Sequence, residues 1–350
     1  MVTDQPATRR SDSVRKTAAP TPTPGLAPMS WLRAHMVELT LMGALLLAVA
    51  YFGYLGYGLL TPQTVAEKFS GAKALAYTAR QLEYGPRITG KPAHTQMADW
   101  LIQELRTLGW DVVVQPFVTS GNVPARNIIA VRSADAANAN APVGILATRY
   151  DSRQFADSDP TPDNRGQPVP GAVGNASGVA TLLELARTVD TAATRHSLCL
   201  AFLDAESNRG IAGWEAPYGG SQFVQALSRE IPRCAQPRFA VVLDSVGSTD
   251  QQIYLERSSD PSLSAALWGT AAELGHGSHL IGELKWTAQD LAHGAFTDVG
   301  VPAAAVVDLD YAYRNTVDDT LDKVDAASLA RLGETLKAWL ERGAPFDQGP

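Results

Sequence analysis

The chain has 350 residues, of which 45% are hydrophobic and 19% charged, and its formal net charge at pH 7 is −7. An acidic chain lacks the basic footprint of a nucleic-acid-binding protein, so we expect no nucleic-acid partner. It holds six histidines and two cysteines, with no HExxH pattern and no CxxC pair, which excludes the zinc sites that these motifs form.

The N-terminal region predicts a tail followed by a membrane helix. Residues 1–38 begin with a stretch rich in Pro, Thr, Ala and Arg that cannot bury much apolar surface, so we expect a disordered tail. Residues 39–60 carry no charge and, at ~1.5 Å rise per residue, are long enough to span a ~30 Å hydrocarbon core. The basic residues before this segment place the N-terminus in the cytoplasm and the main domain in the periplasm or outside the cell.

A cleavable signal peptide is the alternative to this single-pass anchor. Ala48-Val49-Ala50 has the small-x-small form of a cleavage site. However, the apolar run continues to Leu60 and the segment before it is long for a signal peptide, which favours an uncleaved anchor. A helix buried in a protein core is disfavoured by the length of the apolar run.

Beyond a linker at residues 61–75, the pattern predicts one α/β domain over residues 76–343 and a C-terminal tail at 344–350. Short apolar runs predict strands, and segments with apolar residues at helical spacing separate most of them. The expected strands are 111–118, 127–132, 143–147, 198–203, 239–243 and 303–307, and the expected helices are 96–108, 176–190, 221–228, 262–274 and 326–341. Unbroken apolar strands that alternate with helices indicate a three-layer α/β/α sandwich with a mixed, mostly parallel central sheet.

Acidic residues follow three of the predicted strands. Asp151, Glu206 and Asp244 each lie just after an apolar run, and Asp290 and His293 lie before the last strand. Functional residues of such sheets gather at the strand ends, and clustered carboxylates usually need a cation. In secreted enzymes of this outline the cation is most often zinc, held by His and Asp or Glu.

These motifs resemble those of a known family. Residues 76–343 are similar to the co-catalytic zinc aminopeptidases, and especially to the glutaminyl cyclases of the same fold. The motifs that carry the resemblance occur in the family's order: GPRITG (85–90), RYDSRQF (149–155), GAVGNASGVATLLELAR (171–187), FLDAES (202–207), YGGSQF (218–223), VLDSVG (242–247), GVPAAAV (300–306) and RNTVDDTLDKVD (314–325). The resemblance implies the zinc-exopeptidase fold.

The resemblance also implies a metal site at which this chain has lost most of the ligands. Arg149 stands at the position of the first His ligand, whereas Asp151, which orients that ligand in the family, is kept. Gly174 replaces the bridging Asp, Ser207 the ligand Glu and Asn315 the last His. The three ligands of the single-zinc cyclase arrangement correspond to these last three positions, so that arrangement is lost as well.

Two positions of the family's site remain acidic. Asp244 matches a ligand, and Glu206 matches the general base. Because Gly, Ser and Asn are poor zinc ligands, the resemblance implies a non-catalytic binding or scaffolding protein with no cofactor, whose partner is a peptide or a membrane protein. The alternative is an active metallo-aminopeptidase or glutaminyl-peptide cyclotransferase that acts on peptide N-termini through a rebuilt zinc site, with Asp290, His293 and Glu206 as candidates.

Arg149 provides a hypothesis for how the fold tolerates the loss of a metal. Its guanidinium can pair with Asp151, Asp244 or Glu206 and balance the charge that a metal would balance. A surface arginine that extends over the sheet edge is the alternative.

The sequence also leads to expectations for two aspartates, two tryptophans and the two cysteines. We expect Asp318 and Asp319 to cap the turn that follows them. Trp214 and Trp286 are candidates either for the lining of a substrate pocket or for core packing. Two cysteines, Cys199 and Cys234, form either a disulfide, as suits an oxidising compartment, or a pair of buried thiols.

Overall fold

A computed structural model of the chain describes residues 33–60, 67–134, 141–216, 218–288 and 291–347. The chain divides into two compact units, Met1–Val65 and Ala66–Pro350. Most of the predicted N-terminal tail, residues 1–32, lies outside the described residues.

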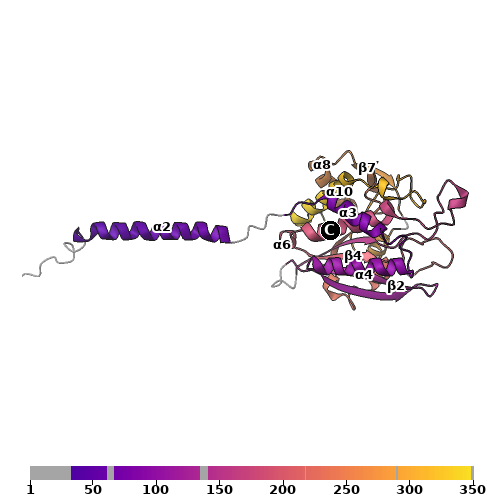
Figure 1. Cartoon of the computed structure of the whole chain (residues 1–350), viewed down its shortest axis with the longest axis horizontal. Coiled ribbons are helices and arrows are strands. Elements are labelled where there is room, and N and C mark those ends of the chain that lie inside the picture. The colour runs from indigo at the N-terminus through magenta and orange to yellow at the C-terminus, as the bar shows by residue number, and fades with distance from the viewer. Residues whose placement is uncertain (1–32, 61–66, 135–140, 217, 289–290, 348–350) are drawn as a thin grey trace, which may run out of the picture. The chain divides into compact units, whose positions relative to one another are not determined.

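In the described part of the first unit lies a long apolar helix, α2 (Met36–Leu60; Figure 1). It starts three residues before the predicted span and includes Glu38 in its first turn. Its segment Met36–Gly53 has a mean hydropathy of 1.8, so α2 is long and apolar enough to cross a membrane, a test that a signal sequence also meets. The prediction of an apolar N-terminal helix is therefore confirmed.

The second unit is built on a six-stranded sheet. Its strands are β1 (Asp111–Val118), β2 (Pro124–Arg132), β3 (Val143–Arg149), β4 (Ser197–Leu203), β5 (Pro237–Asp244) and β8 (Ala303–Val307). They lie in the order β1-β2-β4-β3-β5-β8. Strand β2 pairs antiparallel with both β1 and β4, whereas β4, β3, β5 and β8 are parallel to one another. The sheet is mixed and mostly parallel, as predicted.

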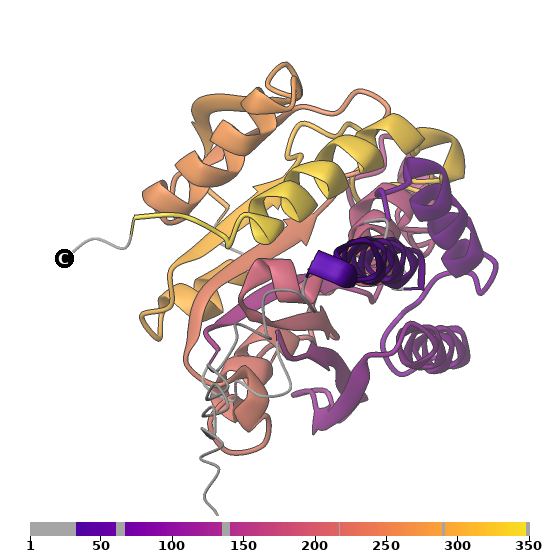
Figure 2. The same cartoon turned by 90° about the vertical axis from the view of Figure 1, so that its left-hand side faces the viewer.

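Helices cover both faces of the sheet. On one face lie α3 (Gly71–Leu82), α4 (Pro92–Thr107), α5 (Ser177–Thr188), α8 (Pro261–Glu273) and α10 (Ala326–Glu341), with the short α6 (Thr191–Thr194) beside α10. On the other face lie α7 (Gly219–Ala226) and α9 (His293–Thr297). Figure 2 shows α10, in yellow, running beside α8 across the first face. The three-layer α/β/α sandwich is thus confirmed.

The period-two geometry of the strands divides the apolar residues between two cores. In β5, Phe239 and Val241 pack into the core beneath α5 and α10, whereas Ala240 and Val242 face α7 and α9. Strand β4 divides its residues in the same way. Because both faces are buried, these strands are continuous apolar runs in the sequence, and this is why they could be predicted.

The start of the domain corrects the predicted linker at 61–75. Phe69 is buried, and its ring packs directly on Gly333 of α10. A Cβ atom at position 333 would lie 2.1 Å from this ring, so no larger residue fits there. The Ser70 side chain then accepts a hydrogen bond from the N–H of Lys73 and caps α3. The structured domain therefore includes residues 67–75. Helix α3 was missed although its buried residues recur at helical spacing, because those residues are small or polar.

The end of the domain corrects the predicted tail at 344–350. Ala344 is fully buried, and the ring of Phe346 packs edge-on against Phe239 with the centroids 6.2 Å apart. The indole N–H of Trp339 donates to the carbonyl of Pro345 at 3.1 Å. Residues 344–347 belong to the domain, and 348–350 lie outside the described residues.

A second, two-stranded sheet was not predicted. Strands β6 (Ile253–Glu256) and β7 (Leu280–Trp286) pair in parallel at the edge of the domain near α8. Most of the side chains of β7 are exposed or partly exposed, so its sequence carries no continuous apolar run.

The two cysteines form a disulfide. Cys199 lies in β4 and Cys234 in the 3₁₀ helix Pro232–Cys234 that precedes β5, and both are fully buried. The bond closes a loop with a sequence separation of 35. The disulfide interpretation is confirmed and the buried-thiol interpretation is wrong.

The double substitution Cys199→Ala/Cys234→Ala should lower the free energy of unfolding of the domain by about 3–4 kcal/mol, the loop-closure contribution expected for a loop of this length. Urea unfolding followed by tryptophan fluorescence measures the change. The oxidised wild type and the variant should differ, and the wild type in reductant should approach the variant. Identical urea midpoints for the oxidised wild type and the variant would contradict the expectation.

Glu184 is a buried carboxylate at the junction between α3 and α5. It accepts the N–H of Ser70 at 2.8 Å and two guanidinium N–H groups of Arg187 at 2.6 and 2.8 Å. Burial raises the pKa of Glu184 from 4.5 to about 7, although the N–H of Ser70 and the charge of Lys73 oppose this shift.

This shift predicts a pH dependence of stability. Between pH 4.5 and about 7 the folded domain binds a proton at Glu184 that the unfolded chain has released, so this group's contribution to stability is lost as the pH rises through that window. In the wild type the urea midpoint should fall between about pH 5 and about pH 8, a range that covers most of this window. Glu184→Gln should reduce that fall. The exposed carboxylate of Glu273 provides the control variant Glu273→Gln, which should leave the slope unchanged. An unaltered slope in Glu184→Gln would refute the assignment.

Candidate functional site

Three neighbouring parallel strands bring acidic residues to one edge of the sheet. Asp151 follows β3, Glu206 follows β4 and Asp244 ends β5. A cavity of about 340 Å³ opens beside them. It is lined by Arg149, Arg153, Glu206, Ser207, Arg209, Gly210, Tyr218, Leu291, Arg314 and Asn315.

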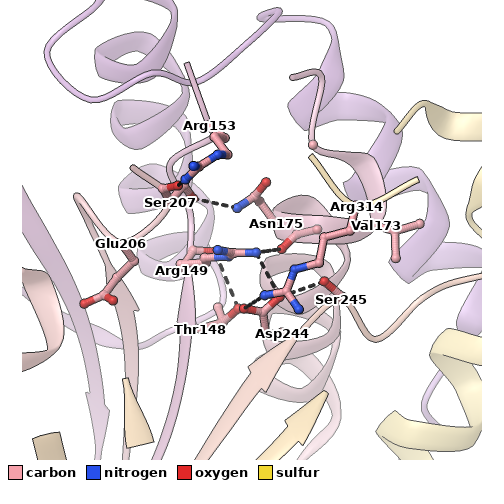
Figure 3. A network of polar contacts seen from close by, with 12 residues as sticks. Thr148, Arg149, Arg153, Val173, Asn175, Glu206, Ser207, Asp244, Ser245 and Arg314 are labelled. Carbon is pink, nitrogen blue, oxygen red and sulfur yellow. Dashed lines mark hydrogen bonds and ion pairs between the residues drawn. The ribbon is translucent and has the colours of Figure 1, made fainter. Parts of the chain in front are cut away.

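Arg149 points into this edge and pairs with Asp244 (Figure 3). Its Nη2 lies 3.0 Å from Oδ1 of Asp244, and its Nε and Nη2 donate to the carbonyl of Gly174 at 3.2 and 3.1 Å. The side chain of Arg149 is 14% exposed. The hypothesis that this guanidinium balances a strand-end carboxylate is confirmed for Asp244, and the surface alternative is wrong.

Asp244 faces a second guanidinium. Nη2 of Arg314 lies 3.9 Å from its Oδ2, and the hydroxyl of Ser245 donates to its Oδ1 at 2.7 Å. Burial lowers the pKa of Arg314, and the positive charges of Arg149 and Arg153 act in the same direction, while Asp244 opposes them. One carboxylate is therefore shared between two cations.

Asp151 organises the backbone after β4. Its Oδ1 accepts the N–H of Glu206 at 3.1 Å and its Oδ2 accepts that of Ser207 at 2.9 Å. Complete burial is the main reason why the pKa of Asp151 is raised, and the negative charge of Asp204 is the second. The side chain that the resemblance assigns to ligand orientation here fixes the loop that carries Glu206.

Glu206 is bound to groups of its own loop and of α7. Its Oε2 accepts Nε and Nη2 of Arg209 at 2.9 and 2.7 Å, and its Oε1 accepts the N–H of Gly220 at 2.7 Å. In Figure 3 its carboxylate points away from Arg149 and Asp244. Both oxygens of the residue in the general-base position thus already accept hydrogen bonds.

The remaining three positions are also placed at this edge. Gly174 presents its carbonyl to Arg149, as described above, and the hydroxyl of Ser207 donates to the carbonyl of Asp151 at 2.7 Å and accepts from Nδ2 of Asn175 at 2.9 Å. Asn315 lines the cavity with a left-handed backbone (φ 56°). The structure therefore brings together the residues that the sequence singled out.

Asp319 corrects an expectation. It does not cap the turn that follows it but the segment Ala172–Ala176, because its Oδ1 accepts the N–H of Val173 at 2.7 Å and its Oδ2 that of Gly174 at 3.1 Å. Asp318 is exposed. The carboxylate of Asp319 thus holds the Gly174 segment against the edge of the sheet.

His293 does not join Glu206 in a rebuilt site. It is buried in α9, and its Nε2 lies 2.9 Å from Oγ of Ser258 and 3.3 Å from Oε2 of Glu256. Asp290, the other candidate, lies outside the described residues. Among the residues that the structure describes, no group of three or more His, Cys, Asp or Glu side chains is arranged to hold a metal ion.

The sequence analysis singled out Arg149 but missed three other arginines that line the cavity. Arg153 follows β3, Arg209 follows β4 and Arg314 follows β8, so each lies beyond a strand end, the signal that singled out the carboxylates. The tryptophans do not line this cavity. Trp214 packs in a small core with Phe117, and the indole of Trp286 donates to Asp310 at 3.4 Å.

Comparison with known proteins agrees with this geometry. The sequence profile of peptidase family M28 matches residues 127–340. The chain belongs to this family. The M28 domain is similar to the solved Zn-dependent exopeptidase of Parabacteroides distasonis, with 25% identity, a TM-score of 0.71, and coverage of 79% of this chain and 99% of that chain.

Two further solved structures are similar over the same share of the chain. The Tannerella forsythia glutaminyl cyclase has 26% identity and a TM-score of 0.71, with coverage of 79% of this chain and 99% of that chain. The leucine aminopeptidase precursor of Bacteroides thetaiotaomicron has 26% identity and a TM-score of 0.68, with coverage of 79% and 97%. The comparison with curated proteins found no match. The predicted family and fold are confirmed.

Because Arg149 and Asp244 are paired, substitutions at the two positions should have non-additive effects on the free energy of unfolding. Arg149→Met should lower the free energy of unfolding by about 3 kcal/mol, because it leaves the buried Asp244 carboxylate without its hydrogen-bonded cation. Arg149→Met/Asp244→Asn should recover more than half of this loss, as a double-mutant cycle in urea measures.

The exposed pair Arg233–Asp111, with an N–O distance of 2.8 Å, provides the control. The same cycle on that pair should show no measurable coupling, because solvent screens it. Additive effects of the Arg149 and Asp244 substitutions would show that the pair is not stabilising.

Proposed function

We propose that this M28 domain is a membrane-anchored, extracytoplasmic binding or scaffolding protein that catalyses neither peptide hydrolysis nor cyclisation. One observation carries the proposal. The Arg149 guanidinium is hydrogen-bonded to Asp244 and to the carbonyl of Gly174, the two positions between which the family resemblance expects a zinc ion.

The residues present do not fit zinc. Of the five ligand positions that the resemblance implies, only Asp244 carries a carboxylate, and both of its oxygens face guanidinium groups. Gly174 has no side chain, and the hydroxyl of Ser207 already donates one hydrogen bond and accepts another. A divalent cation next to Arg149 would also be repelled by its positive charge.

Glu206 alone is a weak basis for catalysis. Without a metal there is no Lewis acid and no lowering of the pKa of a bound water. General-base help contributes only ~10²–10⁴-fold, and here both carboxylate oxygens accept hydrogen bonds from Arg209 and Gly220.

The location is supported by two features. Helix α2 is long and apolar enough to serve as an uncleaved single-pass anchor, and the basic residues before it favour a cytoplasmic N-terminus. The Cys199–Cys234 disulfide suits an oxidising compartment such as the periplasm or the cell exterior. A peptide or another membrane protein is the partner class that such a domain would meet.

An active metallo-aminopeptidase or glutaminyl-peptide cyclotransferase, with zinc in a rebuilt site, is the second candidate. It is favoured by the strained backbone around the cavity, since Ala205, Ser245 and Asn315 all have a positive φ. Such residues cluster at active sites and ligand sites. Binding sites and catalytic sites share this property, so it supports the second candidate less strongly than the Arg149 contacts support the first.

Metal analysis and activity assays on the full-length chain in non-ionic detergent separate the two. We expect no stoichiometric zinc and no turnover of aminopeptidase or glutaminyl-cyclase substrates, with or without added zinc, and the same result for Glu206→Gln. Stoichiometric zinc together with turnover that Glu206→Gln abolishes would overturn the proposal.

A further inference from the structure

We propose that the cavity beside Arg149 and Arg314 binds a small organic anion through its carboxylate or phosphate oxygens. This inference deepens the proposed function and rests on it, because a zinc ion at the same edge would change the charge of the cavity.

The charge of the cavity lining is positive. Four guanidinium groups line it, and three of them have a carboxylate partner: Arg149 pairs with Asp244, Arg209 with Glu206, and Arg153 with Asp157. One positive charge is therefore in excess. These four arginines are Arg149, Arg153, Arg209 and Arg314. Arginine guanidinium groups bind planar carboxylates and phosphates with two parallel hydrogen bonds, so such a lining is suited to an oxyanion.

Arg314 has donors to spare. Its guanidinium donates no hydrogen bond to the residues that the structure describes, and its ion-pair contact with Asp244 is long, at 3.9 Å. Its side chain is only 26% exposed and is placed beside Asp244 in Figure 3. Burial lowers the pKa of Arg314, and the charges of Arg149 and Arg153 act in the same direction, whereas Asp244 opposes them. The guanidinium thus carries its charge in a buried place beside two other cations. An oxyanion would both accept these donors and balance this charge.

Arg209, another arginine of the lining, is held in place. Its guanidinium carbon lies 3.8 Å from the centroid of the Tyr218 ring, and two of its nitrogens bond Glu206. A guanidinium fixed in this way loses little conformational freedom when a ligand binds.

The size of the cavity limits the ligand. About 340 Å³ is at the small end of the range for ligand pockets, and the lining includes the apolar contribution of Tyr218 and Leu291. The site therefore fits a compact anion with a short carbon skeleton better than a long peptide.

Isothermal titration calorimetry on the full-length chain in non-ionic detergent tests the inference. The probes are citrate, for carboxylates, and inorganic phosphate, at an ionic strength held constant with sodium chloride. We expect saturable binding of at least one probe, and the stronger of the two identifies the oxyanion class. Arg314→Gln should weaken binding at least tenfold, and Arg314→Lys, which keeps the charge but loses the planar fork, should weaken it less.

Arg229→Gln, at an exposed arginine of the loop after α7, is the matched control and should bind as the wild type does. The thermal midpoint of each variant without ligand shows whether it is folded. Binding that is unchanged in Arg314→Gln, or no binding of either probe by the wild type, would overturn the inference. Zinc analysis of the same preparation separates the two failures: without zinc only this inference falls, whereas stoichiometric zinc with turnover removes the proposed function as well.

Discussion

The balance of charge at the carboxyl ends of β3, β4 and β5 is the constraint on which the rest of this domain depends. Parallel strands bring Asp151 and Asp244 to one edge where both are buried, and unpaired buried carboxylates are costly. Asp151 is compensated by two backbone N–H groups, whereas Asp244 is compensated by the guanidinium of Arg149. The proposed loss of a metal from this edge is thus compatible with the fold, because a side chain supplies the positive charge.

Most of the sheet could be predicted from the sequence because its strands are buried on both faces. Strands β1 and β8 have the predicted bounds, and the ends of the others differ by a few residues. The errors lie where burial depends on distant partners. Phe69 is buried only because α10 presents Gly333 beneath it, and Ala344 and Phe346 only because the chain returns to Phe239. No local pattern encodes these contacts.

The candidate site was predictable to the same degree. The pairing of Arg149 was a hypothesis from the family resemblance, which puts Arg149 and Gly174 at two ligand positions. The structure places Glu206, Ser207 and Asn315 around the same cavity. The partners of His293 could not be predicted, because Glu256 and Ser258 come from β6 and the turn after it, which the sequence pattern does not mark. Arg153, Arg209 and Arg314 were missed because arginine is usually a surface residue, and only the fold turns them towards the same cavity as Arg149.

Gly174 has a consequence for the reversibility of the proposed change. A Cβ atom added there would lie 3.0 Å from Oδ2 of Asp319 and 3.9 Å from Nη2 of Arg149. An aspartate at this position would thus set its carboxylate beside that of Asp319 and would offer it to a guanidinium instead of a metal. Restoring one ligand at a time therefore adds repulsion or a new ion pair before any zinc can bind. If the proposed function holds, a zinc site could be restored only by several substitutions made together, and a single substitution would leave the edge occupied by Arg149.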